Sequence, residues 1–365
     1  MTSRERLFAA LAGRPSDHVP VWLLFPYHPT SYYVDVRRHP AYRPVAEAAR
    51  RMAVTLNRRH FRVPLHAPAV TWRHEDSGGV KRSTLTCGAA RLVQEQGPGR
   101  VKKLLDTDED LAAWLRLPLN LDARAIRAAL DGQLARHEQE RREFPTDDGA
   151  MMLDLGEPIG PLYGHANLES YAIWSLTHDE AVREFLDRVM VQKRIVYTWC
   201  LERELADVYF LVGSELASPP LVSRATFQRW ILPHARELIA LVRGHGKHVI
   251  QHYHGAIREI LPDFAAMSPD GLHTIEAPPV GDCTFTQAYE TLGDGITLIG
   301  NVQYDEFRAR SRPQMEAAVR QVLDECRGRR LILSPSAGPF DENPSPRLIE
   351  NYLTFLETAW AYPWA

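Results

Sequence analysis

The C-terminal half of the chain alternates short apolar runs with longer segments of helical period, and this alternation constrains the fold more than any other feature. The apolar runs of strand length are 206–212, 247–251, 271–275, 296–299 and 331–333. The helical segments that follow them are 223–243, 256–266, 285–292, 312–327 and 346–360. Strand–helix units in succession predict a parallel sheet, either closed into a barrel or open and doubly wound. The chain has no GxGxxG or Walker loop, which disfavours dinucleotide and nucleoside triphosphate binding.

The N-terminal half is less regular. Residues 2–11 read as a helix, and 19–24 read as a first barrel strand. Residues 68–105 alternate apolar and polar side chains around two glycine turns, which predicts a small antiparallel insertion. Because no Gly-, Ser- or Pro-rich linker interrupts the chain, the simplest expectation is one α/β domain over residues 1–365. Its expected form is a (β/α)8 (TIM) barrel with an N-terminal helical segment and this insertion.

Composition excludes several classes of protein. With 43 basic and 46 acidic residues the formal charge is −3, so the chain lacks the basic bias of a nucleic-acid-binding protein. It also lacks the apolar run of a signal peptide and any run long enough to span a membrane. The four cysteines are far apart and are interpreted as reduced thiols: Cys87, Cys200, Cys283 and Cys326. These features predict a cytoplasmic protein without a membrane partner.

Ionisable residues follow several of the predicted strands, and in a (β/α)8 barrel the active site lies where the strands end. His252 and His254 alternate on an extended segment, so both imidazoles can face one side. Glu276 follows the next strand. Two histidines and a carboxylate suit zinc, and equally iron(II). The sequence therefore predicts a metal site at these residues. The alternative is an ordinary surface or core histidine pair.

Other candidate residues follow the remaining strands. Glu215 is a candidate further ligand or general base, or else a charge before the helix that begins near Ser223. Candidate substrate contacts are Asn301, Gln303 and Ser336, with a turn held by the Asn side chain as the alternative.

Four aromatic side chains after the first strand are further candidates: Tyr27, His28, Tyr32 and Tyr33. They are expected to form an aromatic wall for the substrate, or else to fill the core, and Tyr27 and His28 are the predicted substrate contacts among them. The other histidines are interpreted as structural or surface residues, among them His165, His234, His245, His248 and His273.

Several segments in this order resemble the uroporphyrinogen decarboxylase superfamily over nearly the full length of the chain. They are residues 4–11, 19–23, 246–252, 278–282 and 300–303. The resemblance implies a (β/α)8 barrel, and a homodimer is a family expectation. The decarboxylases carry an Arg-Gln-Ala-Gly-Arg segment after the first strand, whose arginines hold carboxylates. Here residues 25–29 read Phe-Pro-Tyr-His-Pro, which argues against a tetrapyrrole poly-acid substrate.

The same superfamily includes zinc methyltransferases, whose metal motif resembles His-x-Cys, then a Glu in the synthases, then a late Cys. In this chain His252 matches the first ligand, His254 stands in place of the Cys, and Glu276 matches the carboxylate. The segment 334–338 has no late Cys. A site without thiolates is harder, so an oxygen-bearing group becomes a better metal partner than a thiol.

The resemblance leads to three alternative functions. The leading hypothesis is a metal-dependent methyltransferase or demethylase that acts on a small molecule, with a corrinoid on a separate protein. The second is a non-porphyrin decarboxylase or lyase on the same barrel. The third is a barrel that binds a ligand without turnover.

Overall fold

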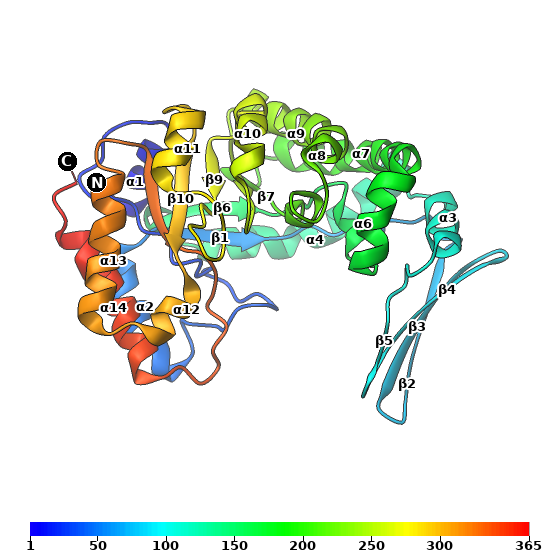
Figure 1. Ribbon diagram of the computed structural model, residues 1–365, viewed down its shortest axis with the longest axis horizontal. Helices are drawn as coiled ribbons and strands as arrows, with labels where there is room; N and C mark the ends of the chain where they lie inside the picture. Colours follow the sequence, from blue (N-terminus) through cyan, green and yellow to red (C-terminus); the bar gives the residue numbers. More distant parts are fainter. Residues whose placement is uncertain (365) are drawn as a thin grey trace.

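The computed structural model describes residues 1–364, and its main feature is a curled parallel sheet of seven strands (Figure 1). Their order is β1-β6-β7-β8-β9-β10-β11. Strands of this sheet that follow one another along the chain therefore lie side by side. The strands are β1 (Thr55–Arg59), β6 (Gly149–Leu153), β7 (Val208–Leu211), β8 (His248–His252), β9 (Gly271–His273), β10 (Thr297–Val302) and β11 (Leu331–Pro335). The predicted α/β class and parallel sheet are confirmed.

The predicted first strand, residues 19–24, connects the two edges of this sheet. The Trp22 N–H donates to the Leu333 carbonyl oxygen at 2.8 Å, in the middle of β11. The Val54 N–H, next to β1, donates to the Val21 carbonyl oxygen at 2.7 Å. Both bridges are parallel but isolated, so this segment pairs over fewer residues than the sequence predicts.

Helices pack around the two sheets (Figure 1). They are α1 (Ser3–Leu11), α2 (Arg43–Met52), α3 (Asp108–Arg116), α4 (Ala123–Glu143), α5 (Gly160–Tyr163), α6 (Leu168–Thr177), α7 (Asp179–Glu202), α8 (Arg224–Trp230), α9 (Leu232–Gly244), α10 (Leu261–Met267), α11 (Phe285–Leu292), α12 (Tyr304–Ala309), α13 (Arg312–Glu325) and α14 (Pro346–Ala361). Short 3-10 turns are η1 (Pro40–Tyr42), η2 (Thr146–Asp148), η3 (Glu215–Ala217) and η4 (Arg258–Ile260). None of the described helices is long and apolar enough to cross a membrane.

One predicted helix, 223–243, is divided in the structure. The first part, α8, ends at Trp230, and α9 begins at Leu232 with Pro233 in its first turn. Proline lacks the N–H of a helix interior but is tolerated at a helix start, so the chain begins a new helix here.

Most of the parallel strands, unlike β1, are buried on both faces, and alternate residues enter two separate clusters. Phe210, Ile250 and Ile332 belong to the inner cluster, which the strands enclose. Tyr209 and Val249 belong to the larger cluster between the strands and the helices. This division follows from the two-residue period of a strand, and it explains why the strands read as continuous apolar runs.

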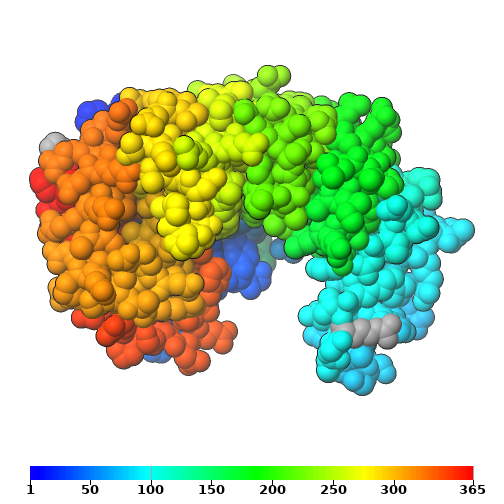
Figure 2. All heavy atoms as spheres, in the orientation of Figure 1, coloured from blue at the N-terminus to red at the C-terminus, as the bar shows by residue number. Residues whose placement is uncertain are grey.

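An antiparallel sheet projects from the rest of the molecule (Figure 1). Its strands, in order across the sheet, are β2 (Thr71–Ser77), β3 (Val80–Cys87), β4 (Ala90–Gly97) and β5 (Arg100–Lys102). Leu85 and Leu92 are buried, whereas every residue of β2 is exposed. The antiparallel insertion expected within residues 68–105 is therefore present. Figure 2 shows a deep hollow between this sheet, in cyan, and the C-terminal helices, in orange and red.

Candidate functional site

A cavity of about 70 Å³ lies at the carboxyl ends of the parallel strands. Its polar lining consists of Tyr33, Arg58, His252, His254, His273 and Ser336. Its apolar lining includes the rings of Trp22, Phe210 and Phe340. Since two of the predicted site histidines and the predicted Ser336 face this one space, it is the candidate active site.

His252 and His273 form a neutral pair of imidazoles. Their Nδ1 atoms are 2.7 Å apart and their rings are stacked with centroids 4.8 Å apart. Burial lowers the pKa of His252 well below its usual value, and the neighbouring His273 and His254 lower it further. Burial, His254 and Arg58 lower the pKa of His273 to about 3, against the opposing hydrogen bond to Pro335. One Nδ1 therefore donates a proton to the other, and neither ring carries a charge near pH 7.

His254 and Glu276 form a charged pair beside these imidazoles. His254 Nδ1 lies 3.3 Å from Glu276 Oε1, and the side chain of Glu276 is 3% exposed whereas that of His254 is 40% exposed. Burial opposes ionisation of both groups, but their mutual hydrogen bond outweighs it. It raises the pKa of His254, and together with the Gly255 N–H it lowers the pKa of Glu276. The pairing therefore favours the protonated form of His254, whose ring is anchored at one nitrogen and reaches solvent.

The backbone around Glu276 requires glycine at two positions. Gly255 adopts a φ of +75°, and its N–H donates to Glu276 Oε2 at 2.7 Å. A Cβ at Gly281 would lie 2.1 Å from the carbonyl oxygen of Glu276. Gly255 thus lets its loop reach the carboxylate, and Gly281 lets the chain pack closely against the backbone of Glu276.

Arg58, at the end of β1, supplies a positive charge to the cavity wall. Its Nε donates to Asp154 Oδ2 at 3.1 Å, and its Nη2 donates to the same oxygen. Its side chain is 16% exposed. Burial lowers the pKa of Arg58, but the charge of Asp154 more than offsets this and raises it.

The donor atoms do not form a ready metal site. His252 Nδ1 is engaged with His273, and the two oxygens of Glu276 are engaged with His254 and the Gly255 N–H. Within residues 1–364, no three His, Cys, Asp or Glu side chains are grouped as ligands of one ion. This arrangement does not fit zinc or iron as it stands. The ligand roles of His252, His254 and Glu276 stay a prediction.

Gln303 and Glu215 lie next to the charged pair. Ser336 Oγ donates to Gln303 Oε1 at 2.9 Å, and the Gln303 side chain helps to lower the pKa of Glu276. Glu215 Oε2 accepts the Gly213 N–H at 2.9 Å, and its charge contributes to the raised pKa of His254. Asn301, in β10, lies in register with Ser334 of β11 and is not among the residues that line the cavity.

The structure places Tyr27 and His28 apart from the cavity lining. Both backbone N–H groups donate to Asn57 Oδ1, at 3.1 and 3.0 Å. His28 Nε2 lies 3.1 Å from Glu143, and the Tyr27 ring packs edge-on against Phe144. These contacts tie the loop after the first strand to the C-terminal end of α4.

His273 and Arg58 line the cavity but are not among the site residues predicted from the sequence, which assigns His273 a structural or surface role. His273 pairs with His252 in the register of β8 and β9, so it faces the same space. The strand-end rule could have found it, since His273 ends its strand three residues before Glu276. Arg58 gave no such signal, because β1 reads Thr-Leu-Asn-Arg-Arg and resembles a polar loop.

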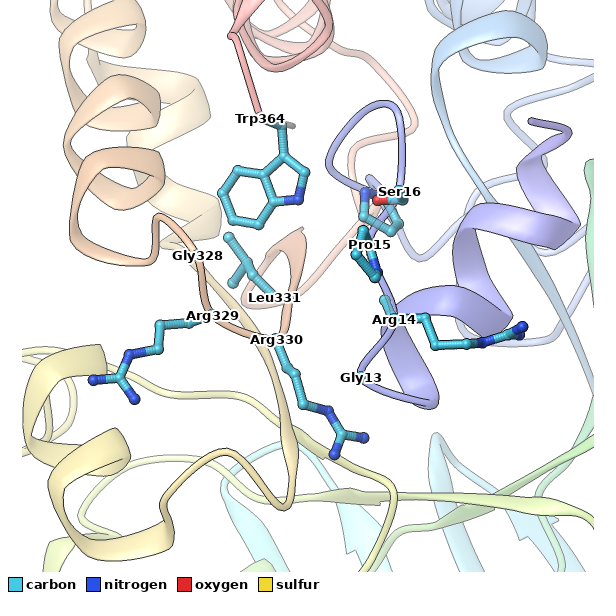
Figure 3. Close-up of a pocket in the computed structure, with 11 residues that line it drawn as sticks. Gly13, Arg14, Pro15, Ser16, Gly328, Arg329, Arg330, Leu331 and Trp364 are labelled. Carbon is cyan, nitrogen blue, oxygen red and sulfur yellow. The ribbon is translucent and has the colours of Figure 1, made fainter.

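A second cavity, of about 250 Å³, lies at the amino ends of the strands (Figure 3). Figure 3 shows Arg14, Arg329 and Arg330 directed to different sides of it. Arg330 Nη1 donates to the carbonyl oxygens of Asp294 and Gly295, both at 2.9 Å. Residues at the amino end of a barrel contribute to stability rather than to catalysis. We therefore interpret Arg330 as a structural clasp, meaning a side chain that holds separate segments together, and not as part of a functional site.

Comparison with known proteins supports the resemblance expected from the sequence. A family model described as uroporphyrinogen decarboxylase (URO-D) matches residues 163–351. Methylcobamide:CoM methyltransferase MtaA of Methanosarcina barkeri is 23% identical over 232 residues, which are 57% of this chain and 63% of that protein. The chain thus spans less than two thirds of that relative. A uroporphyrinogen decarboxylase of Syntrophotalea carbinolica is 23% identical over 336 residues, 88% of each chain.

The fold also resembles that of a solved structure. A methyltransferase from Methanosarcina mazei aligns with a TM-score of 0.59 at 19% identity, over 98% of each chain. This likeness concerns the fold.

Proposed function

The chain belongs to the uroporphyrinogen decarboxylase family, and from that premise we propose that it transfers a methyl group to or from a small molecule. One observation carries this proposal: the His254 imidazole, which is anchored by Glu276 and reaches solvent, lines the cavity at the strand ends. The similarity to methylcobamide:CoM methyltransferases supports the reaction class. In this proposal residues 19–24 complete an eight-stranded barrel over one domain, 1–365.

His254 is the proton carrier of the proposed reaction. Glu276 fixes the imidazole through Nδ1, so the opposite ring nitrogen is the one that faces a ligand. When a methyl–oxygen bond of the substrate breaks, the methyl group passes to an acceptor and the oxygen keeps the electron pair. His254 donates its proton to that oxygen, and in the reverse direction it takes the proton back. A corrinoid on a separate protein would be the methyl acceptor or donor.

The proposal predicts a defined effect of Glu276→Gln on the pH profile. Without the carboxylate the pKa of His254 falls, so less of the acid form remains at neutral pH. We expect kcat to fall about 10- to 100-fold, and the alkaline limb of the profile to move to lower pH. The assay offers a panel of methyl ethers with reduced free cobalamin as acceptor, and follows methylcobalamin by absorbance. Glu290→Gln, an exposed acid on α11, is the control. A Glu276→Gln profile that matches the control would contradict the role of His254.

Metal binding by His252, His254 and Glu276 is a separate part of the proposal. Zinc, or iron in its place, would act as a Lewis acid on the substrate oxygen. To bind it, His252 and His254 would ligate through the ring nitrogens that do not contact His273 and Glu276, and Glu276 must release one of its present partners. We expect one equivalent of metal after purification without chelator, and its loss in the double variant His252→Ala, His254→Ala, by elemental analysis. If titration of the wild-type protein with zinc and with iron(II) gives no binding, this part fails and the proton role of His254 remains.

A decarboxylase or lyase is the second candidate, because the match to a uroporphyrinogen decarboxylase extends over 88% of both chains. It would release carbon dioxide and require no methyl acceptor. Headspace analysis with the same substrate panel separates the two reactions. A barrel that only binds its ligand would give neither product.

A further inference from the structure

The wall of the proposed active site contains a buried arginine that the methyl-transfer proposal does not use. The Arg58 guanidinium carbon lies 4.8 Å from the centre of the Tyr32 ring and 4.9 Å from the centre of the Phe210 ring. These two contacts hold the plane of the guanidinium in a fixed orientation before any ligand arrives. A fixed fork loses less entropy on binding than a flexible lysine would.

Asp154 accepts hydrogen bonds from only some of the N–H groups of this guanidinium. Both Nε and Nη2 donate to one oxygen of Asp154, Oδ2. The other oxygen, Oδ1, accepts the Gly156 N–H at 3.1 Å. A guanidinium has five N–H donors, so even with the nearby Tyr33 hydroxyl as an acceptor, donors remain for a ligand.

The rest of the cavity has no negative charge to meet these donors. None of the residues that line it, all within the described chain, is acidic. Arg58 also lies close enough to His252 and His273 to disfavour their protonated forms, so the guanidinium and the imidazoles share one space. Flat apolar surfaces, Trp22 and Phe210, complete the walls.

We propose that Arg58 binds a carboxylate, and that the ligand of this site is a small carboxylic acid on a flat apolar frame. The proposal rests on the cavity named in the proposed function, and it adds the class of substrate. The carboxylate pairs with Arg58, the frame lies against the aromatic walls, and the opposite end of the molecule faces His254. A bidentate pair with a buried guanidinium discriminates against neutral analogues of the same shape.

Benzoate and its neutral isostere benzamide test this proposal by calorimetric titration of the full chain. We expect benzoate to bind the wild-type protein at least tenfold more tightly than benzamide. Arg58→Gln should abolish this preference, and Arg58→Lys should reduce it because the ammonium keeps the charge but loses the fork. The matched control is Arg59→Gln, because the adjacent Arg59 pairs with Glu140 and does not line this cavity. Circular dichroism and thermal melting verify that each variant is folded. If Arg58→Gln does not fold, Arg58→Lys still tests the proposal.

Three results would overturn the proposal: no benzoate binding by the wild-type protein, equal affinity for benzoate and benzamide, or an unchanged preference in both Arg58 variants. Binding needs no methyl acceptor, so this test is independent of turnover. A chain that binds benzoate through Arg58 but transfers no methyl group refutes the proposed function alone.

Discussion

At the scale of single residues, the neighbourhood of the site shows how burial controls charge. Glu157 is 2% exposed, and its Oε2 has no hydrogen-bond partner among the residues described. Burial raises the pKa of Glu157 to about 7. Burial likewise lowers the pKa of Lys193, on α7, to about 8, although Asp154 and Glu157 oppose this. Both groups thus titrate near neutral pH, which is unusual for either type of side chain.

The raised pKa of Glu157 makes stability depend on pH with a definite sign. Between its unfolded value of 4.5 and its folded value of about 7, the native protein binds more protons than the unfolded chain. Stability therefore falls as the pH rises through this window, by at most about 3 kcal/mol. Glu157→Gln removes this titration. Its melting temperature, relative to wild type, should increase from pH 5 to pH 8 in thermal melts, whereas Glu290→Gln should show no such trend. A constant difference across that range would contradict the assignment.

At the scale of secondary-structure elements, one arginine joins three separate segments at the amino end of the sheet. Arg330 precedes β11, and its guanidinium donates to carbonyl oxygens of Leu11 at the end of α1 and of Asp294 and Gly295 before β10. Its Nε also donates to Thr297 Oγ1 at 3.2 Å. The carbonyl groups at helix and loop ends have no partner within their own elements, so this side chain replaces water there.

Removal of this clasp should destabilise the fold without altering the cavity at the opposite end. Arg330→Met leaves several carbonyl oxygens without donors, and we expect the free energy of unfolding to fall by about 3 kcal/mol in urea titrations. Arg329→Met is the matched control. Arg329 is about half exposed and pairs with Asp294 on the surface, so its loss should cost less than about 1 kcal/mol. Equal effects of the two variants would show that the clasp is not structural.

Most helices and strands could be predicted from the sequence. Which strands pair, and therefore which side chains meet in the site, could not. Strands such as β7 and β11 are buried on both faces, so they read as apolar runs. By contrast, β1 has four polar residues among five, and its role depends on parallel pairing with β6, which lies about ninety residues later. Arg58 was missed for this reason. The pairing of His273 with His252 likewise depends on the register of β8 against β9, which periodicity does not specify.

At the scale of the whole molecule, one edge of the projecting sheet has no paired strand within residues 1–364. Strand β2 is the edge strand, and all of its residues are exposed (Figure 1). Such an edge offers unpaired N–H and C=O groups to another chain. Arg73 and Glu75 form an ion pair of 2.8 Å on one face of this strand. When two copies of β2 pair antiparallel with His74 opposite His74, Arg73 lies opposite Glu75 of the partner subunit in both directions. The strand is therefore complementary to itself in charge.

This self-complementarity gives the expected homodimer a specific interface and a charge-swap test. Cross-strand pairs of opposite charge stabilise a sheet and like charges directly opposite destabilise it. We expect the wild-type chain to be a dimer by light scattering coupled to size-exclusion chromatography. Arg73→Glu would place four acids at the contact and should yield a monomer. The double variant Arg73→Glu, Glu75→Arg restores opposite charges and should restore the dimer. Arg91→Glu, on the interior strand β4, is the control and should leave the dimer intact. A wild-type monomer at all concentrations, or a dimer that survives Arg73→Glu, would exclude the β2 edge as the interface.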